Sequence, residues 1–236
     1  MMSNGAVSSA VAVLIAAAGL ASAQTLEIVD DLPGEFVDIT ELGAEALHLS
    51  ADLSAEITTS IGNAVFPAGR VVVGNNGGLG FDPPDDFLAP LNEEIPSDNA
   101  FGGGKAGLVF WDDIGNDVGD PYWLELGDRV IIQWHDSHFE DSEDTARFQI
   151  QIFDLGAPGP PSIYGQFIYD DIEQPRPDGG ASATIGYQNG GVGFNDVQWS
   201  FNTPGAVANG TVLSIIPEPS TVVLVGFGAF ALIRRR

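Results

Sequence analysis

The chain has 236 residues, of which 33 are acidic and 8 are basic, so its formal net charge is −25 at pH 7. Such a charge excludes nucleic acid as a partner, because phosphate binding requires a basic surface. The chain contains no cysteine, so no disulfide stabilises its fold and stability must come from burial, backbone pairing or bound ions.

The first segment is typical of an export signal. Residues 6–20 form a run of small and apolar side chains, and Ala21, Ser22 and Ala23 fit the small-x-small cleavage pattern. Cleavage there leaves Gln24 as the first mature residue. The first nine residues contain no Lys or Arg, which departs from the usual positively charged start. We predict a helical signal peptide over residues 1–23; the alternative is an alanine-rich first helix of the fold.

The body, residues 24–216, has the length of one domain and the pattern of an all-β protein. Residues 41–47 predict one or two helical turns, and elsewhere glycines and prolines separate short apolar runs. Strands are predicted at residues 36–39, 55–60, 70–73, 79–81, 107–111, 122–125, 129–134, 146–153, 162–169, 183–188, 197–201 and 211–216.

The alternation within residues 129–134 and 146–153 indicates how these strands pack. Apolar side chains alternate there with polar ones such as Gln149 and Gln151, which places the apolar set on one face and the glutamines outward. This pattern is the mark of antiparallel sheets with one buried and one solvated face. Two buried faces must meet, so we predict an antiparallel β-sandwich.

Two stretches of this body predict particular connections. Residues 74–78 are rich in Asn and Gly, which tolerate positive φ, so they predict the clearest hairpin, between residues 70–73 and 79–81. Four prolines between residues 83 and 96 predict a long irregular loop, of the kind that is often functional or mobile.

Two acidic stretches are candidates for a bound cation. Calcium takes six to eight oxygen ligands, which clustered carboxylates in a loop supply. The spacing is not that of an EF-hand, and for each loop a solvated turn is the alternative. Apart from Ca²⁺ we predict no cofactor. The candidate ligands are Asp136, Glu140, Asp141 and Asp144 in one loop, and Asp112, Asp113, Asn116 and Asp117 in the other.

Candidates for chemistry are few. Tyr122 and Trp123 follow Pro121 in the sequence and are the best candidates to stack on a sugar, whereas alternation favours a core position for Trp111 and Trp134. The chain has no Gly-x-Ser-x-Gly elbow and no phosphate-binding loop, and among its many carboxylates no pair stands apart as a glycosidase pair. We therefore predict that the protein is not an enzyme.

The last twenty residues have three parts. An uncharged run at residues 222–233 would span about 18 Å as a helix, short of the roughly 30 Å of a bilayer core, unless flanking residues extend it. The closing arginines would stay in the cytoplasm by the positive-inside rule. We predict a short transmembrane helix; a buried C-terminal helix is the alternative. The flanking parts are Pro217, Glu218, Pro219, Ser220 and Thr221 before the run, and Arg234, Arg235 and Arg236 after it.

This order of parts resembles the PEP-CTERM sorting signal of Gram-negative and related bacteria. The resemblance covers residues 217–236 and rests on the motif Pro217–Thr221. It implies recognition by an exosortase, a membrane enzyme that cleaves near the motif, and an intermediate anchored in the inner membrane. It further implies delivery to the cell surface or extracellular matrix, in bacteria that make extracellular polysaccharide.

The body is similar to the nidogen-like extracellular β domain over about residues 70–190. That similarity implies a fold and an extracellular setting, and it supplies no catalytic residue. It rests on Val73-Gly74-Asn75-Asn76-Gly77, Leu108-Val109-Phe110-Trp111-Asp112-Asp113, Val130-Ile131-Ile132-Gln133-Trp134, Phe148-Gln149-Ile150-Gln151-Ile152 and Thr184-Ile185-Gly186-Tyr187-Gln188-Asn189.

These observations predict an exported surface or matrix protein of structural or adhesive type. A first alternative is a carbohydrate-binding module that contacts extracellular polysaccharide through Tyr122 and Trp123. A glycan hydrolase is a second alternative.

Overall fold

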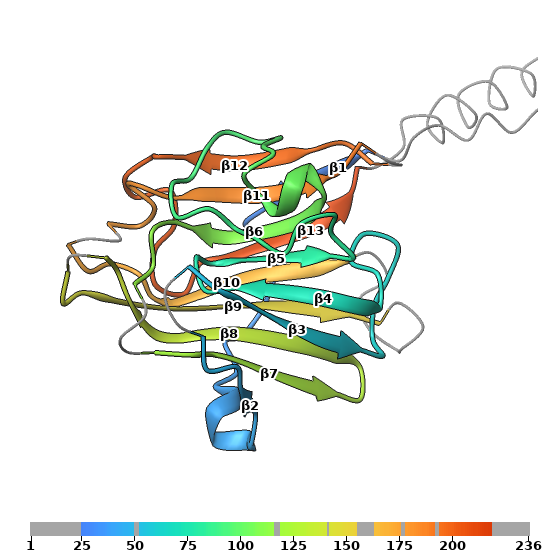
Figure 1. Cartoon of the computed structure of the whole chain (residues 1–236), viewed down its shortest axis with the longest axis horizontal. Helices are drawn as coiled ribbons and strands as arrows, with labels where there is room; N and C mark the ends of the chain where they lie inside the picture. Colours follow the sequence, from blue (N-terminus) through green and yellow to red (C-terminus); the bar gives the residue numbers. More distant parts are fainter. Residues whose placement is uncertain are drawn as a thin grey trace, which may run out of the picture.

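Two antiparallel sheets lie over one another and form a β-sandwich in the computed structural model (Figure 1). The structure describes residues 25–49, 52–115, 119–140, 142–154, 163–175, 178–191 and 194–218. The predicted all-β fold class is therefore confirmed. The predicted signal helix and the predicted anchor helix lie outside the described residues. Among the residues that are described, no helix has the length and apolar character needed to span a bilayer.

The larger sheet has seven strands in the order β1-β13-β10-β9-β8-β7-β2. The C-terminal strand β13 thus lies inside the sheet, between β1 and β10, while β1 is at the edge. The bounds are β1 (Leu26–Val29), β2 (Glu45–Ala46), β7 (Pro121–Leu126), β8 (Arg129–His138), β9 (Thr145–Phe153), β10 (Gly165–Asp171) and β13 (Val212–Pro217).

The smaller sheet has six strands in the order β12-β11-β6-β5-β4-β3. Two short 3-10 helices, η1 (Ile39–Leu42) and η2 (Phe101–Gly103), lie in the connections. The bounds of the strands are β3 (Ser54–Thr59), β4 (Gly69–Gly74), β5 (Gly78–Phe81), β6 (Lys105–Trp111), β11 (Thr184–Asn189) and β12 (Val197–Phe201).

The strands predicted from the sequence match these elements, with one exception at the N-terminal side. Residues 36–38 form no ladder and lead into η1, so the strand predicted at 36–39 is wrong. The predicted helical turns at 41–47 are replaced by the end of η1 and the short strand β2. Strands β1 and β2 were not predicted, because four and two residues are too few to show a period.

The main core fills the space between the two sheets, as the alternation predicts. Trp134 and Phe148 stack there with ring centroids 5.1 Å apart. Two buried side chains tie one sheet to the other: Trp134 Nε1 donates to the Gly74 carbonyl at 3.0 Å, and the Tyr169 hydroxyl donates to the Val109 carbonyl at 2.7 Å. Burial raises the pKa of Tyr169 well above its ordinary value, so this hydroxyl stays a donor.

The outer face of the six-stranded sheet is also covered. The loop predicted to be irregular, residues 82–104, packs over it and buries a second apolar cluster. Trp111 belongs to this second cluster rather than to the main core, and its Nε1 donates to the Ala89 carbonyl at 2.6 Å. The buried members of the cluster are Val72, Leu88, Ala100, Phe101, Ala106, Leu108 and Trp111.

The predicted hairpin at residues 74–78 is confirmed, and its turn also organises β6. The Gly77 carbonyl accepts from the backbone N–H groups of both Val109 and Phe110, each at 3.0 Å. Gly77 has φ +81°, and a Cβ there would lie 1.9 Å from the Phe110 carbonyl oxygen. The turn therefore needs glycine both for its conformation and for the close approach of β6.

We predict that Gly77→Ala lowers the free energy of unfolding by more than about 3 kcal/mol, because positive φ and a backbone collision add. Gly210→Ala is the matched control, since Gly210 has φ +82° and a Cβ added there would meet no atom within 4 Å. It should cost only about 1 kcal/mol. Urea denaturation of residues 24–218, which include both sheets, measures the difference; equal losses would contradict the steric argument.

Candidate functional site

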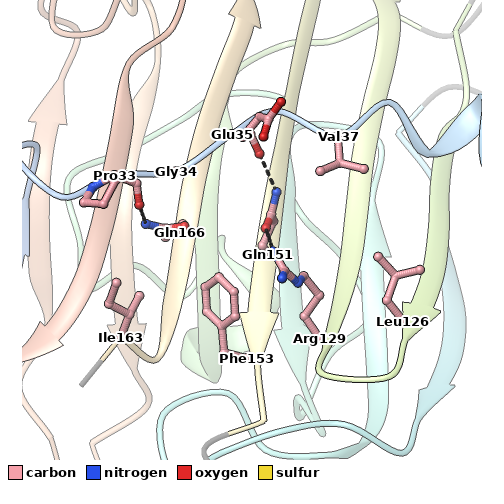
Figure 2. A pocket seen from close by; sticks show the side chains of 10 residues that line it. All are labelled: Pro33, Gly34, Glu35, Val37, Leu126, Arg129, Gln151, Phe153, Ile163 and Gln166. Atoms are coloured by element: carbon pink, nitrogen blue, oxygen red, sulfur yellow. Dashed lines mark hydrogen bonds between the residues drawn. The ribbon is translucent and has the colours of Figure 1, made fainter. Parts of the chain in front are cut away.

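The most distinctive surface feature is an extended segment that crosses the outer face of the seven-stranded sheet. We call residues 30–38, between β1 and η1, the strap. Figure 2 shows it passing over β10, β9 and β8. It forms no strand of either sheet. Because it is held without a backbone ladder, its contacts with side chains of the sheet determine where it lies.

Those contacts come from buried glutamines. Gln166 Nε2 donates to the Pro33 carbonyl at 3.0 Å, and Gln151 Nε2 donates to the Glu35 carbonyl at 2.9 Å (Figure 2). The captured carbonyls are two residues apart, which is the period of an extended chain. The strap is thus bound through its backbone.

Two further glutamines extend the row toward η1. Gln149 Nε2 makes a longer contact with the Val37 carbonyl at 3.4 Å, and Gln133 Oε1 accepts from the Ile39 N–H at 3.1 Å. The four glutamine side chains are at most 3% exposed. The row of Gln133, Gln149, Gln151 and Gln166 is called the glutamine row below.

The register of the strands places the glutamine row on one face. Gln133 is opposite Gln149 on β8 and β9, and Gln151 is opposite Gln166 on β9 and β10. The prediction that these side chains point away from the main core is confirmed, but the prediction that their face is solvated is wrong. A buried amide is costly unless it is hydrogen-bonded, and the strap supplies the missing acceptors.

A groove of about 410 Å³ lies between the strap and the neighbouring ends of the strands (Figure 2). Phe153 stands in its middle, between Ile163 and Arg129. Its volume falls in the range of about 300–1,000 Å³ that is usual for small-molecule sites. The lining residues are Pro33, Gly34, Glu35, Val37, Leu126, Arg129, Gln151, Phe153, Ile163 and Gln166.

Among the described residues that line this groove, Arg129 is the only cation. Its Nε and Nη2 donate to the Asp128 carboxylate at 3.0 and 2.8 Å, and its Nη1 donates to Gln151 Oε1 at 2.9 Å. The guanidinium carbon lies 5.2 Å from the centroid of the Phe153 ring, a cation–π contact. Hydrogen bonds from Arg129 lower the pKa of Asp128, so the two side chains form a neutralised pair at the rim.

A second hollow, of about 430 Å³, shares Pro33 and Gly34 with the groove. Its lining includes Asp30 and Asp31 from the strap and residues 210–212, which lead into β13. The two hollows therefore adjoin at Pro33 and Gly34 of the strap.

One of the predicted cation ligands of the first acidic loop is paired with an arginine. Asp136 Oδ1 accepts from Arg147 Nη2 at 2.5 Å and from Arg147 Nε at 3.0 Å. Burial lowers the pKa of Arg147, but the hydrogen bonds and charges of Asp136 and Asp170 outweigh burial, so the pKa is raised. Glu140 and Asp144 lie in the turn between β8 and β9, and Asp141 lies outside the described residues.

The second acidic loop is built into the fold as well. The Ser182 hydroxyl donates to Asp112 Oδ2 at 2.6 Å, and the Asp113 carbonyl accepts from the Glu140 N–H at 3.0 Å. Asn116 and Asp117 lie outside the described residues. Within the residues that are described, no three His, Asp or Glu side chains gather in a way that suits a metal ion. Calcium binding stays a prediction.

The predicted sugar-stacking pair is split between two faces of β7. Trp123 is paired with Ile132 and packs against the main core, and no described residue accepts a hydrogen bond from its buried Nε1. Tyr122 is paired with Gln133 on the outer face, where its ring lies edge-on to His135 with centroids 5.9 Å apart. Tyr122 and Trp123 therefore form no common platform.

The groove was not predicted, because its lining residues are scattered along the sequence. Arg129 and Phe153 are directly opposite one another on β8 and β9, and Gln151 is a near neighbour. One pattern in the sequence could have indicated the groove: glutamines recur on the same face of consecutive strands. Such a row of amide side chains predicts a polar face that is covered by a specific partner.

The sorting motif begins inside the fold. Pro217 is the last residue of β13 and pairs with Leu26 of β1, and the Glu218 N–H donates to the Thr25 carbonyl at 2.8 Å. The described part of the motif thus lies beside the start of the predicted mature chain. The predicted cleavage residues Ala21, Ala23 and Gln24, the rest of the motif and the three arginines lie outside the described residues.

Comparison with known proteins identifies this tail. Residues 216–236 match the family model described as the PEP-CTERM protein-sorting motif. No curated protein and no solved structure matches the chain. The match is confined to the tail, so the similarity of the body to nidogen-like domains rests on the residues quoted for it. The tail is a PEP-CTERM sorting motif, which implies export, processing by an exosortase and a membrane-anchored intermediate before release to the cell surface.

We predict that Gly34→Ala destabilises the strap. A Cβ at Gly34 would lie 2.7 Å from Val212 Cγ1 and 2.9 Å from Gln166 Oε1, so the strap would have to rise off the glutamine row. The expected loss of unfolding free energy is about 1–3 kcal/mol, as for other overpacked sites. Gly127→Ala is the control, because a Cβ added at Gly127 would meet no described atom within 4 Å. It should change the free energy of unfolding by less than about 0.5 kcal/mol. Similar losses in both variants would contradict this account.

We predict equal melting temperatures in millimolar Ca²⁺ and Mg²⁺ at matched ionic strength, because Arg147 already occupies the Asp136 carboxylate. Screening of the acidic surface acts equally for both ions. A specific flexible site of oxygen ligands would instead favour Ca²⁺ and would raise stability with the logarithm of its concentration. A higher melting temperature in Ca²⁺ alone, abolished by Glu140→Gln, would contradict the solvated-turn alternative and support the predicted calcium site.

Proposed function

We propose that the protein is a non-enzymatic structural or adhesive component of the cell surface or extracellular matrix, delivered through its sorting motif. The observation that carries the proposal is the continuity of that motif with the fold: the match begins at Ile216, within β13. The chain therefore presents its body directly at the motif, with no intervening linker between strand and signal.

The pairing of β1 with β13 supports the same role. Leu26 to Val29 are registered with Pro217 to Ser214, and Asn195 braces this edge by accepting from the Leu26 N–H at 2.6 Å and donating to the Leu26 carbonyl at 3.1 Å. Removal of residues 1–23 and of the chain beyond Glu218 would leave every one of these contacts in place. Processing at both ends is thus compatible with an intact sandwich.

The surface charge and covered faces also suit an extracellular structural protein. The acidic excess keeps copies of the body apart in solution and favours solubility. Both outer faces carry a packed covering, the strap on one sheet and residues 82–104 on the other. A body of this kind depends on neither a disulfide nor a partner to bury its core.

A carbohydrate-binding role is the second candidate, and one observation favours it. The groove under the strap combines an aromatic ring, a guanidinium and glutamine amides in one place. Tyr122 and Trp123, which carried this alternative in the sequence, do not provide such a combination.

We predict that the mature surface form starts at Gln24 and lacks Arg234, Arg235 and Arg236. Cell fractionation followed by mass spectrometry of the termini measures this directly. In a strain without exosortase the protein should stay in the membrane fraction with its arginine tail. Pro219→Ala should reduce release, and Pro90→Ala, a change in the loop over the other sheet, should not. Intact Met1 and Arg236 in surface material would refute the proposed route.

A further inference from the structure

The groove under the strap is built from polar groups that hold one another in fixed positions. Gln151 Oε1 accepts from Arg129, while its Nε2 donates to the Glu35 carbonyl at 2.9 Å and to Gln149 Oε1 at 3.0 Å. The orientation of the Gln151 amide is therefore set by three partners. A site whose polar groups are already ordered loses little conformational entropy when a ligand binds.

Arg129 has donors left for a ligand. A guanidinium has five N–H groups, and among the described residues three hydrogen bonds from Arg129 go to Asp128 and Gln151. The side chain is 31% exposed, so the remaining N–H groups are within reach of solvent and of a bound molecule. Planar donors of this kind suit hydroxyl oxygens as well as carboxylates.

The apolar part of the groove lies beside these donors. Phe153 stands between Ile163 and Arg129, and Leu126 lies beyond Arg129 (Figure 2). A ligand that fits must therefore offer hydrogen-bonding groups along one side and C–H surface along the other. Among common biological molecules, sugars combine these two properties in every unit.

Charge narrows the class of sugar. The positive charge of Arg129 is matched by the neighbouring Asp128 carboxylate, 2.8 Å from Arg129 Nη2. An acidic sugar would meet a site that is not positive, in a chain whose net charge is −25. Like charges that are brought together in a partly desolvated site cost free energy, so an uncharged sugar is favoured.

The extent of the hollow points to a chain rather than to a free monosaccharide. The second hollow adjoins the groove across Pro33 and Gly34, and the strap runs along both. A polymer could occupy the groove with one unit and continue along the strap with the next.

We propose that the groove under the strap binds uncharged units of a polysaccharide chain, with Phe153 as the apolar surface and Arg129, which Gln151 holds in position, as the hydrogen-bonding group. This inference deepens the proposed adhesive function by naming a ligand class for it. Ligand binding by the groove requires only the folded body. The binding experiment can therefore fail while the sorting route is correct, and the sorting route can be wrong while the groove binds a saccharide.

The test is isothermal titration of the purified mature protein with neutral tetrasaccharides of glucose, galactose, mannose or N-acetylglucosamine, and with a tetrasaccharide of uronic acids. We expect binding of at least one neutral ligand and weaker binding of the uronate. Phe153→Ala and Arg129→Gln should each weaken the neutral ligand about tenfold, because each removes one side of the contact. Tyr122→Ala, on the same face but outside the groove, is the matched control and should bind like the unaltered protein.

Thermal melting of each variant separates loss of the site from loss of the fold. If Phe153→Ala melts early, Phe153→Leu keeps an apolar side chain while removing the ring, and it should still weaken binding. The proposal is overturned if no neutral saccharide binds at millimolar concentration, if the uronate binds more tightly, or if only Tyr122→Ala reduces binding.

Discussion

The outer face of the seven-stranded sheet depends on one interaction, the hydrogen bonding of buried glutamine amides to backbone carbonyls of the strap. Gln151 and Gln166 are nearly inaccessible to water, and each donates one amide N–H within the sheet, to Gln149 Oε1 and to Ser214 Oγ. Without the strap, each would lose the acceptor of its other N–H. The captured carbonyls of Pro33 and Glu35 fix the strap in turn. The strap then forms one wall of the groove, so the candidate site exists because this polar face is satisfied.

The sandwich is covered on the outer face of both sheets. Over the six-stranded sheet, residues 82–104 bury an apolar cluster around Trp111, whose Nε1 donates to the Ala89 carbonyl. A buried glutamine holds this segment too: Gln188 Nε2 donates to the Ser97 carbonyl at 3.2 Å and to the Gly104 carbonyl at 3.0 Å, and Gln188 Oε1 accepts from the Ser97 N–H at 2.6 Å. Both coverings are therefore fixed by buried amides that bind backbone groups, and the segment over the six-stranded sheet adds an apolar cluster to these bonds.

The first and last described residues of the domain lie side by side, next to the two predicted processing sites. Thr25 and Glu218 are joined by a backbone hydrogen bond, so the two segments predicted to enter the membrane leave the sandwich at the same edge. The proposed surface protein would be held by this edge before release. Among the described residues, the groove is lined by β7 to β10 and the strap, and the second hollow reaches β13 only at Val212, the end of that strand opposite to Pro217. Tethering and ligand binding can therefore be separate properties of one body.

The amino-acid sequence by itself determined the route, the fold class and most of the strands. Period-two alternation in residues 129–134 and 146–153 depends only on neighbours along the chain, and the sorting motif is a contiguous stretch, so both can be read locally. Tertiary structure decided the rest. Gln149 and Gln151 look like solvated residues until a segment more than a hundred positions away covers them, and Trp123 looks exposed until its strand partner places it inward. The groove joins residues of the strap to Arg129 and Phe153, and such long-range proximity follows from strand order and register, which no local pattern encodes.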